Sequence, residues 1–152
     1  MIQSTVRMPA DVATSGLVLI DATGLYLNVS DGSPYTFEFY VLYTVGNSAT
    51  FINVGIVTPT FSKYSATVVA QSADGASPFG VRTDGWLTAS GDAVRGASGS
   101  NNMVPGRVYL SVIKGTIFPS ATGTLQVQFC RSNSGTPVTV KANSFGILSV
   151  GY

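Results

Sequence analysis

Alternation of apolar and polar side chains, with a period of two residues, is the feature that most restricts how this chain can fold. In the segment 35–43 one side of the chain carries Tyr35, Phe37, Phe39, Val41 and Tyr43, and the other carries Thr36, Glu38, Tyr40 and Leu42. Leu125, Val127 and Phe129 alternate with Gln126 and Gln128 in the same way. A period of two puts successive side chains on opposite faces of an extended strand. Both segments are therefore predicted to be β-strands, with Phe37, Phe39, Val41, Leu125, Val127 and Phe129 in the core.

Short apolar segments bounded by turn residues recur along the rest of the chain. Further predicted strands are 17–20, 25–29, 51–57, 65–70, 85–89, 108–113, 138–141 and 145–150. Turns are predicted at 31–34, 46–48, 74–75, 84–85, 105–106 and 134–137, where Gly, Pro, Asn and Asp gather. A helix over 66–73 is disfavoured because Thr67, Val68 and Val69 are β-branched. The predicted fold is all-β: one domain over residues 1–152, an antiparallel β-sandwich of jelly-roll type with about 8–10 short strands.

The segment 90–106 interrupts this rhythm. It is rich in Gly, Ser and Asn, and Arg95 and Met103 stand within it. Long loops without secondary structure are uncommon and often functional. We expect either a contact loop that presents Arg95 and Met103, or an ordinary connection between strands.

Charged residues make up only 10% of the chain, against about 25% in an average soluble domain. Hydroxyl and amide side chains must supply the exposed polar surface, or partners must cover part of it. The net charge is +1 and no basic run occurs, so nucleic acid is not an expected partner. No apolar stretch approaches the length of a membrane span and no secretory signal is visible, so we expect a protein made in the cytoplasm that has no membrane partner.

The residues offer little for catalysis or metal binding. With no histidine and one cysteine, Cys130, the chain lacks His-dependent triads and pairs of His or Cys ligands. We expect Cys130 to be an unreactive packing or surface thiol. Asp31, Asp74 and Asp84 each precede glycine, as turn-forming aspartates do, and no calcium-binding run of carboxylates is present. The sequence predicts no catalytic residue, cofactor or metal; a hydrolase that uses carboxylates alone is the weakest alternative.

Aromatic residues provide candidates for contacts. Trp86, near Arg82 and Asp84, could form a sugar-binding platform, but Trp86 and most tyrosines are more simply explained as core or interface side chains. Tyr40 falls on the solvent side of its predicted strand, so it is a candidate for a contact buried between subunits. The candidate contact residues are thus Tyr40, Trp86, Arg95 and Met103.

Several segments resemble small β-rich virion proteins of tailed bacteriophages. The likeness covers most of the chain and lies in strand and turn patterns at 34–39, 42–44, 114–117, 123–129 and 136–145. The resemblance implies a non-enzymatic particle component, such as a capsid decoration (cement) protein or a fibre or tail domain. It also implies a homotrimer, location in the virion, and contact with other virion proteins such as the major capsid protein. The alternative is a receptor- or carbohydrate-binding fibre module whose loops touch a host glycan.

Overall fold

The computed structural model describes residues 2–74, 77–95, 103–132 and 136–151. No helix occurs in these residues, and all their regular structure is β-strand. The strands are β1 (Ile2–Arg7), β2 (Val12–Thr14), β3 (Ile20–Val29), β4 (Tyr35–Val45), β5 (Ile52–Val57), β6 (Phe61–Asp74), β7 (Ser77–Leu87), β8 (Ala93–Arg95), β9 (Tyr109–Pro119), β10 (Gly123–Arg131), β11 (Val138–Val140) and β12 (Phe145–Val150). The predicted all-β class is confirmed.

The strands pair as one long hairpin folded back on itself. β1 pairs with β12, β2 with β11, β3 with β10, β4 with β9, β5 with β8, and β6 with β7, all antiparallel. Rolling this hairpin produces two sheets. The larger has the order β1-β12-β4-β9-β6-β7, with β11 and β2 joined to β4, and the smaller has the order β3-β10-β5-β8. Nested pairs rolled into two antiparallel sheets define a jelly roll, which confirms the predicted architecture.

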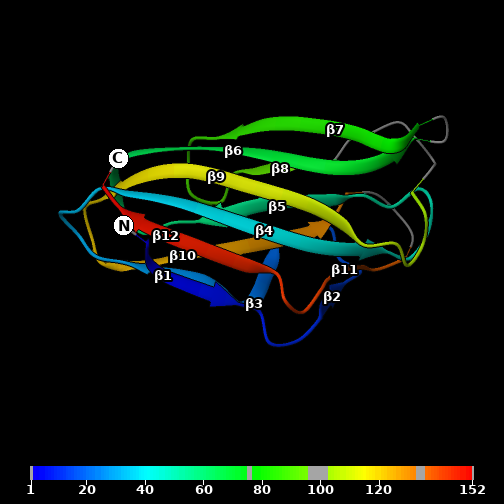
Figure 1. The fold of residues 1–152 in the computed structure, drawn as a ribbon, viewed down its shortest axis with the longest axis horizontal. Coiled ribbons are helices and arrows are strands. Elements are labelled where there is room, and N and C mark those ends of the chain that lie inside the picture. Colours follow the sequence, from blue (N-terminus) through cyan, green and yellow to red (C-terminus); the bar gives the residue numbers. More distant parts are fainter. Residues whose placement is uncertain (1, 75–76, 96–102, 133–135, 152) are drawn as a thin grey trace.

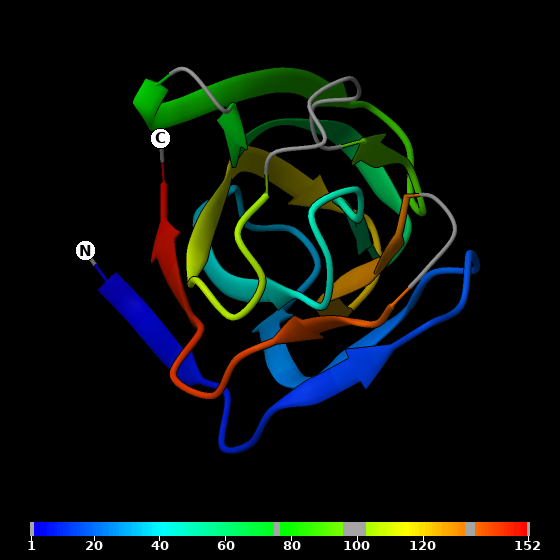
Figure 2. The same cartoon turned by 90° about the vertical axis from the view of Figure 1, so that its right-hand side faces the viewer.

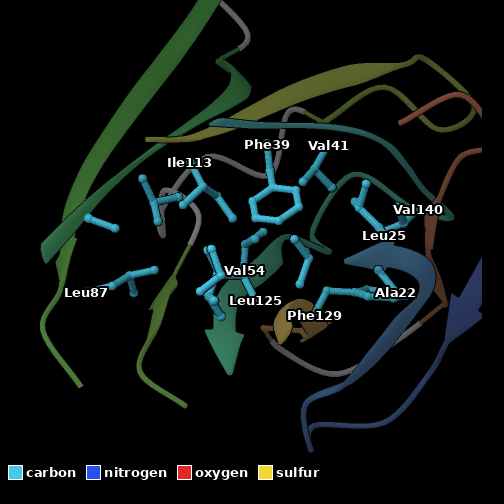
Figure 3. Packing of buried hydrophobic residues seen from close by; sticks show 14 of the residues in the cluster. Ala22, Leu25, Phe39, Val41, Val54, Leu87, Ile113, Leu125, Phe129 and Val140 are labelled. Atoms are coloured by element: carbon cyan, nitrogen blue, oxygen red, sulfur yellow. The ribbon is translucent and has the colours of Figure 1, made fainter. Parts of the chain in front are cut away.

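Figure 1 looks onto the larger sheet, with β7 at the top and β1 at the bottom, and the smaller sheet lies behind it. The apolar sides of both sheets meet between these layers. All six core residues predicted from the alternation are buried, with exposures of 0–1%. Phe39, Val41 and Ile113 from the larger sheet face Val54, Leu125 and Phe129 from the smaller one (Figure 3).

The structure corrects the prediction of a strand over 17–20. Only Ile20 is in a strand, the first residue of β3, while Leu17 and Val18 are 61% and 77% exposed in the β2–β3 loop. β3 begins its pairing with β10 at Ile20, which lies opposite Phe129, and before that residue the carbonyl of Gly16 accepts the Arg131 N–H. Without a partner strand, a short apolar run has no ladder to join.

Three further expectations differ from the structure. Residues 84–85 lie inside β7, where Gly85 pairs with Val68, rather than in a turn, because the ladder with β6 outweighs the local turn preference. The segment 90–106 contains the short strand β8, which pairs with β5. Strands β1, β2 and β8 were not predicted, so the described chain has twelve strands rather than about 8–10. Gly75 and residues 134–135 lie outside the described residues.

Candidate interaction surface

The outer face of the larger sheet, the side turned away from the core, has an apolar patch at its centre with polar and charged side chains around it. In its centre it carries Tyr40 and Leu42 from β4, Leu110 and Val112 from β9, and Phe145 and Ile147 from β12, all half-buried. An antiparallel sheet ordinarily packs one face on the core and exposes a polar face to water. Here the outer face also carries a continuous apolar patch, beside the polar Thr36, Glu38, Lys114 and Thr116.

Tyr40 lies near the middle of this face. The backbone register sets it between Phe145 on β12 and Val112 on β9. Its ring stacks on Phe145, with 4.6 Å between ring centroids and 15° between ring planes. Strands distant in the sequence therefore form one continuous aromatic and aliphatic patch around the predicted contact residue.

A charged pair adjoins the patch. Lys114 Nζ lies 3.2 Å from Glu38 Oε1, and the Tyr40 hydroxyl donates a hydrogen bond to Glu38 Oε2 at 2.5 Å. The hydrogen bond from Tyr40, followed by the hydrogen bond and charge of Lys114, lowers the pKa of Glu38 below its usual value. The same contacts raise the pKa of Lys114, with Glu38 as the main cause. Both groups are therefore charged at neutral pH.

Two shallow hollows flank Ile147 on the same face. One, of about 340 Å³, is lined by Thr36, Phe37, Glu38, Lys114, Gly115, Ile147 and Ser149. The other, of about 350 Å³, is lined by Thr5, Val6, Arg7, Phe145 and Ile147. The outer face is thus uneven, with recesses that could receive protruding side chains of a partner.

Trp86 lies near one edge of the larger sheet, on β7, and is 73% exposed. The structure therefore excludes Trp86 from the core of this chain, and of the simpler explanation, core or interface, only the interface role stays a prediction. Its backbone pairs with Thr67, which in turn pairs with Lys114. Four tyrosines, Tyr35, Tyr43, Tyr64 and Tyr109, are buried as expected, whereas Tyr26 is 42% exposed.

The other two predicted contact residues do not join this face. Met103 is 2% exposed and belongs to the hydrophobic core, and its N–H donates to the carbonyl of Ser48. This corrects its assignment to an exposed contact loop: an unbranched apolar side chain is stabilised by filling the core. The backbone of Arg95 ends β8, but its side chain lies outside the described part of the structure.

The outer face of the smaller sheet has a different chemistry. Gln126 Nε2 donates to the carbonyls of Ala22 and Leu25 at 3.2 and 3.3 Å, and Gln128 Nε2 donates to Asp21 Oδ1 at 2.8 Å. Asn53 Nδ2 lies 3.5 Å from the sulfur of Cys130. Cys130 is 2% exposed, so it is a buried thiol, in agreement with the prediction. Amide side chains that bond their own chain cover this face.

A second group of exposed apolar side chains lies at one end of the sandwich. Leu17 and Val18 belong to the β2–β3 loop, while Val104 and Val108, 42% and 53% exposed, precede β9. Backbone hydrogen bonds connect the loops of this end, among them Gly106 N–H to the carbonyl of Val45 and Arg131 N–H to that of Gly16. Figure 2 looks directly at it, and we call it the loop end.

Structural partners also hold the carboxylates of Asp92, Asp11 and Asp31. Asp92 Oδ2 accepts the N–H groups of Thr88 and Ala89 at 3.0 and 2.8 Å, and these bonds lower its pKa. Asp11 accepts the N–H of Ala142 and pairs with Lys141, and Asp31 accepts the Thr122 hydroxyl at 3.3 Å. Within the described ranges no cluster of three or more His, Cys, Asp or Glu side chains is arranged to hold a metal ion. No helix there is long and apolar enough to cross a membrane.

Comparison with known proteins finds no matching family model and no matching curated protein. Among solved structures, the chain is similar to those of the Gt and Gx strains of infectious bursal disease virus. The identities are 10% and 12% and the TM-scores 0.26 and 0.27. The VP2 subviral particle of the same virus is 11% identical, with a TM-score of 0.26. Each match covers 97% of this chain but only 36–41% of the viral chain, so this chain spans about two-fifths of their length.

Proposed function

We propose that the protein is a non-enzymatic structural component of a virus particle that acts by packing against other protein surfaces. One observation carries the proposal: the larger sheet has an apolar patch at the centre of its outer face, in addition to its apolar core face. Exposed to water, such a face has an unfavourable solvation free energy, which burial against a partner removes. The scarcity of charged residues, 10% of the chain, is consistent with a surface that is covered in the assembled state.

Within this class we propose a phage capsid decoration (cement) protein. Such a protein needs contacts between its own copies and contacts with the particle, including the major capsid protein. The outer face of the larger sheet and the loop end are two separate surfaces that could serve these roles. Binding would stabilise the shell by mass action, since a ligand that binds only the assembled state shifts the equilibrium toward it. The virion resemblance favours a homotrimer as the unit, and location in the virion.

The particle contact can be tested by cosedimenting the purified chain with purified phage particles that lack it. We expect wild-type protein to move with the particles and a Leu17→Ser/Val18→Ser variant to remain in the supernatant. A Tyr26→Ser variant, which also removes an exposed apolar side chain but from the smaller sheet, should still bind. Failure of the wild type to bind any particle would overturn the virion role.

A carbohydrate-binding fibre module is the second candidate, and the 73% exposure of Trp86 is the observation that favours it. An exposed indole can stack on the apolar face of a sugar ring. A glycan array probed with wild-type protein and a Trp86→Ala variant separates the candidates. Glycan binding that disappears in the variant supports the module, and particle binding that survives the substitution supports the decoration protein.

A further inference from the structure

We propose that two copies of this chain pack face to face through the outer face of the larger sheet. The two-fold axis would run along the strands, between β4 and β9. This contact rests on the proposed function only in that the outer face is covered by protein. It can be tested without a particle.

The position of the axis follows from the strand order. In the path β1-β12-β4-β9-β6-β7, β4 and β9 form the central pair. A two-fold axis between them, in the plane of the contact, places β4 over the partner's β9 and β12 over the partner's β6. The two sheets then coincide over their full width, and their strands run close to parallel or antiparallel, as in aligned sheet packing.

The side chains of the central pair are matched in chemistry. Outward residues directly opposite each other on β4 and β9 are Leu42 with Leu110, Tyr40 with Val112, Glu38 with Lys114, and Thr36 with Thr116. The proposed axis exchanges the members of each pair between subunits. Apolar side chains therefore meet apolar ones, and hydroxyl side chains meet hydroxyl ones.

The charges are self-complementary under the same operation. Glu38 comes to lie over the partner's Lys114, and Lys114 over the partner's Glu38. The ion pair within each chain, 3.2 Å between Nζ and Oε1, is then flanked by a second pair of opposite sign. The four charges nearest the axis sum to zero, so the centre of the contact holds no unpaired charge, which is the condition for burying ions there without a large penalty; Arg7 lies on the edge strand β1, at the rim of the face.

The face is large enough for a stable contact. Six strands about 4.8 Å apart span about 24 Å, and strands of 6 to 14 residues extend about 33 Å on average. The product, about 800 Å², matches the roughly 800 Å² per partner of a standard interface. The smaller sheet offers no equivalent, because Gln126 and Gln128 already donate their hydrogen bonds within the chain.

Charge reversal at Glu38 and Lys114 tests the contact by sedimentation velocity at micromolar protein and low ionic strength. Wild-type protein should form a dimer, or a hexamer if a trimeric contact exists elsewhere. Glu38→Lys and Lys114→Glu each place like charges across the axis, so each should raise the dimer dissociation constant roughly 100-fold or more. Asp21→Lys, on the smaller sheet, is the matched control and should leave the dimer intact.

Mixing the two reversed variants gives the sharpest result. Each variant alone repels its own copy. In a mixed dimer, a Glu38→Lys chain facing a Lys114→Glu chain restores both ion pairs across the axis. Native mass spectrometry with one variant isotope-labelled should therefore show mixed dimers. The double variant E38K/K114E should pair with itself, which also shows that the substitutions do not prevent folding. A wild-type protein that is a monomer, or a trimer that does not dimerise, would overturn the contact. Dimers that survive either single reversal would also overturn it, as would a mixture of the two variants that forms no mixed dimer. Particle binding by a monomer would leave the proposed function standing.

Discussion

Gly115 gives the most direct test of the packing beneath the outer face. It lies on β9 opposite Phe37, and a Cβ atom added there would approach Phe37 Cζ to 2.6 Å, the Ser65 carbonyl oxygen to 2.6 Å and Ala66 Cβ to 2.7 Å. Contacts this short force atoms apart. The Phe37 ring could tilt, but Ser65 is paired with Thr116 in the ladder between β6 and β9, so its carbonyl cannot move without disturbing that ladder.

The expected sign of the change in stability makes Gly115→Ala informative. In an unstrained strand, replacing Gly by Ala stabilises a protein by roughly 0.5–1 kcal/mol, because it reduces the freedom of the unfolded chain. Overpacking a close-packed core costs roughly 1–3 kcal/mol. One of the close contacts is with a backbone atom, so the overpacking cost of Gly115→Ala should lie toward the upper end of this range. The free energy of unfolding should then fall by about 1–2 kcal/mol. For a chain of 152 residues this lowers Tm by about 2–8 °C.

Thermal unfolding at one fixed protein concentration measures the difference in Tm between Gly115→Ala and wild type. Gly16→Ala is the matched control: Gly16 has no positive φ, and the nearest atom to its added Cβ, Thr14 Oγ1, is 3.4 Å away. The control should be neutral or slightly stabilised. A Gly115→Ala variant as stable as wild type, or more stable, would refute the close approach of Phe37 and β6 to this position.

Two further predictions concern single side chains. The pKa of Asp11 is lowered, chiefly by its bond with Lys141 and then by the Ala142 N–H, so its contribution to stability is complete above its ordinary pKa of 3.8 and is lost as the pH falls below it. Asp11→Asn should therefore lower Tm at pH 7, and its Tm should converge with that of wild type in acid; an unchanged difference at every pH would contradict the interaction. Cys130, 2% exposed, should react with a thiol reagent far more slowly in native protein than in denatured protein, whereas comparable rates would place the thiol at the surface.

Much of the fold could be predicted because its central strands are strictly periodic. β4 alternates along its whole length and β10 alternates from Leu125 to Phe129, so their inward faces could be identified residue by residue. β1 and β2 have no comparable signal: β1 pairs with β12 and β2 with β11, partners almost at the other end of the chain. Their existence depends on long-range pairing, which local pattern does not encode. The same dependence turned the predicted turn at 84–85 into the interior of β7.

The candidate surface was only partly predictable for a related reason. Alternation alone placed Tyr40 on the solvent side of β4. Phe145 and Lys114 belong to β12 and β9, which pair with β4 but are distant from it in the sequence. The stacking of Phe145 on Tyr40 and the ion pair of Lys114 with Glu38 could therefore not be predicted from the sequence of β4. Trp86 and Met103 show the limit of composition-based arguments. The aromatic Trp86 is exposed on edge strand β7, and the flexible Met103 is buried although it lies in the loop before β9, because position in the fold decides burial.

The distribution of polarity over the two sheets refines the interpretation of the low charge. If hydroxyl and amide groups simply replaced charges everywhere, both outer faces would be similarly polar. Instead, amides such as Gln126 and Gln128 lie on the smaller sheet, while the larger one carries an apolar patch that includes Tyr40, Val112 and Phe145. One face is therefore compatible with solvent, and the other gains free energy when covered. An asymmetric pair of faces favours a closed contact through the apolar patch over open-ended stacking, since the amide face, where Tyr26 is the exposed aromatic side chain, offers the next subunit less apolar area to bury.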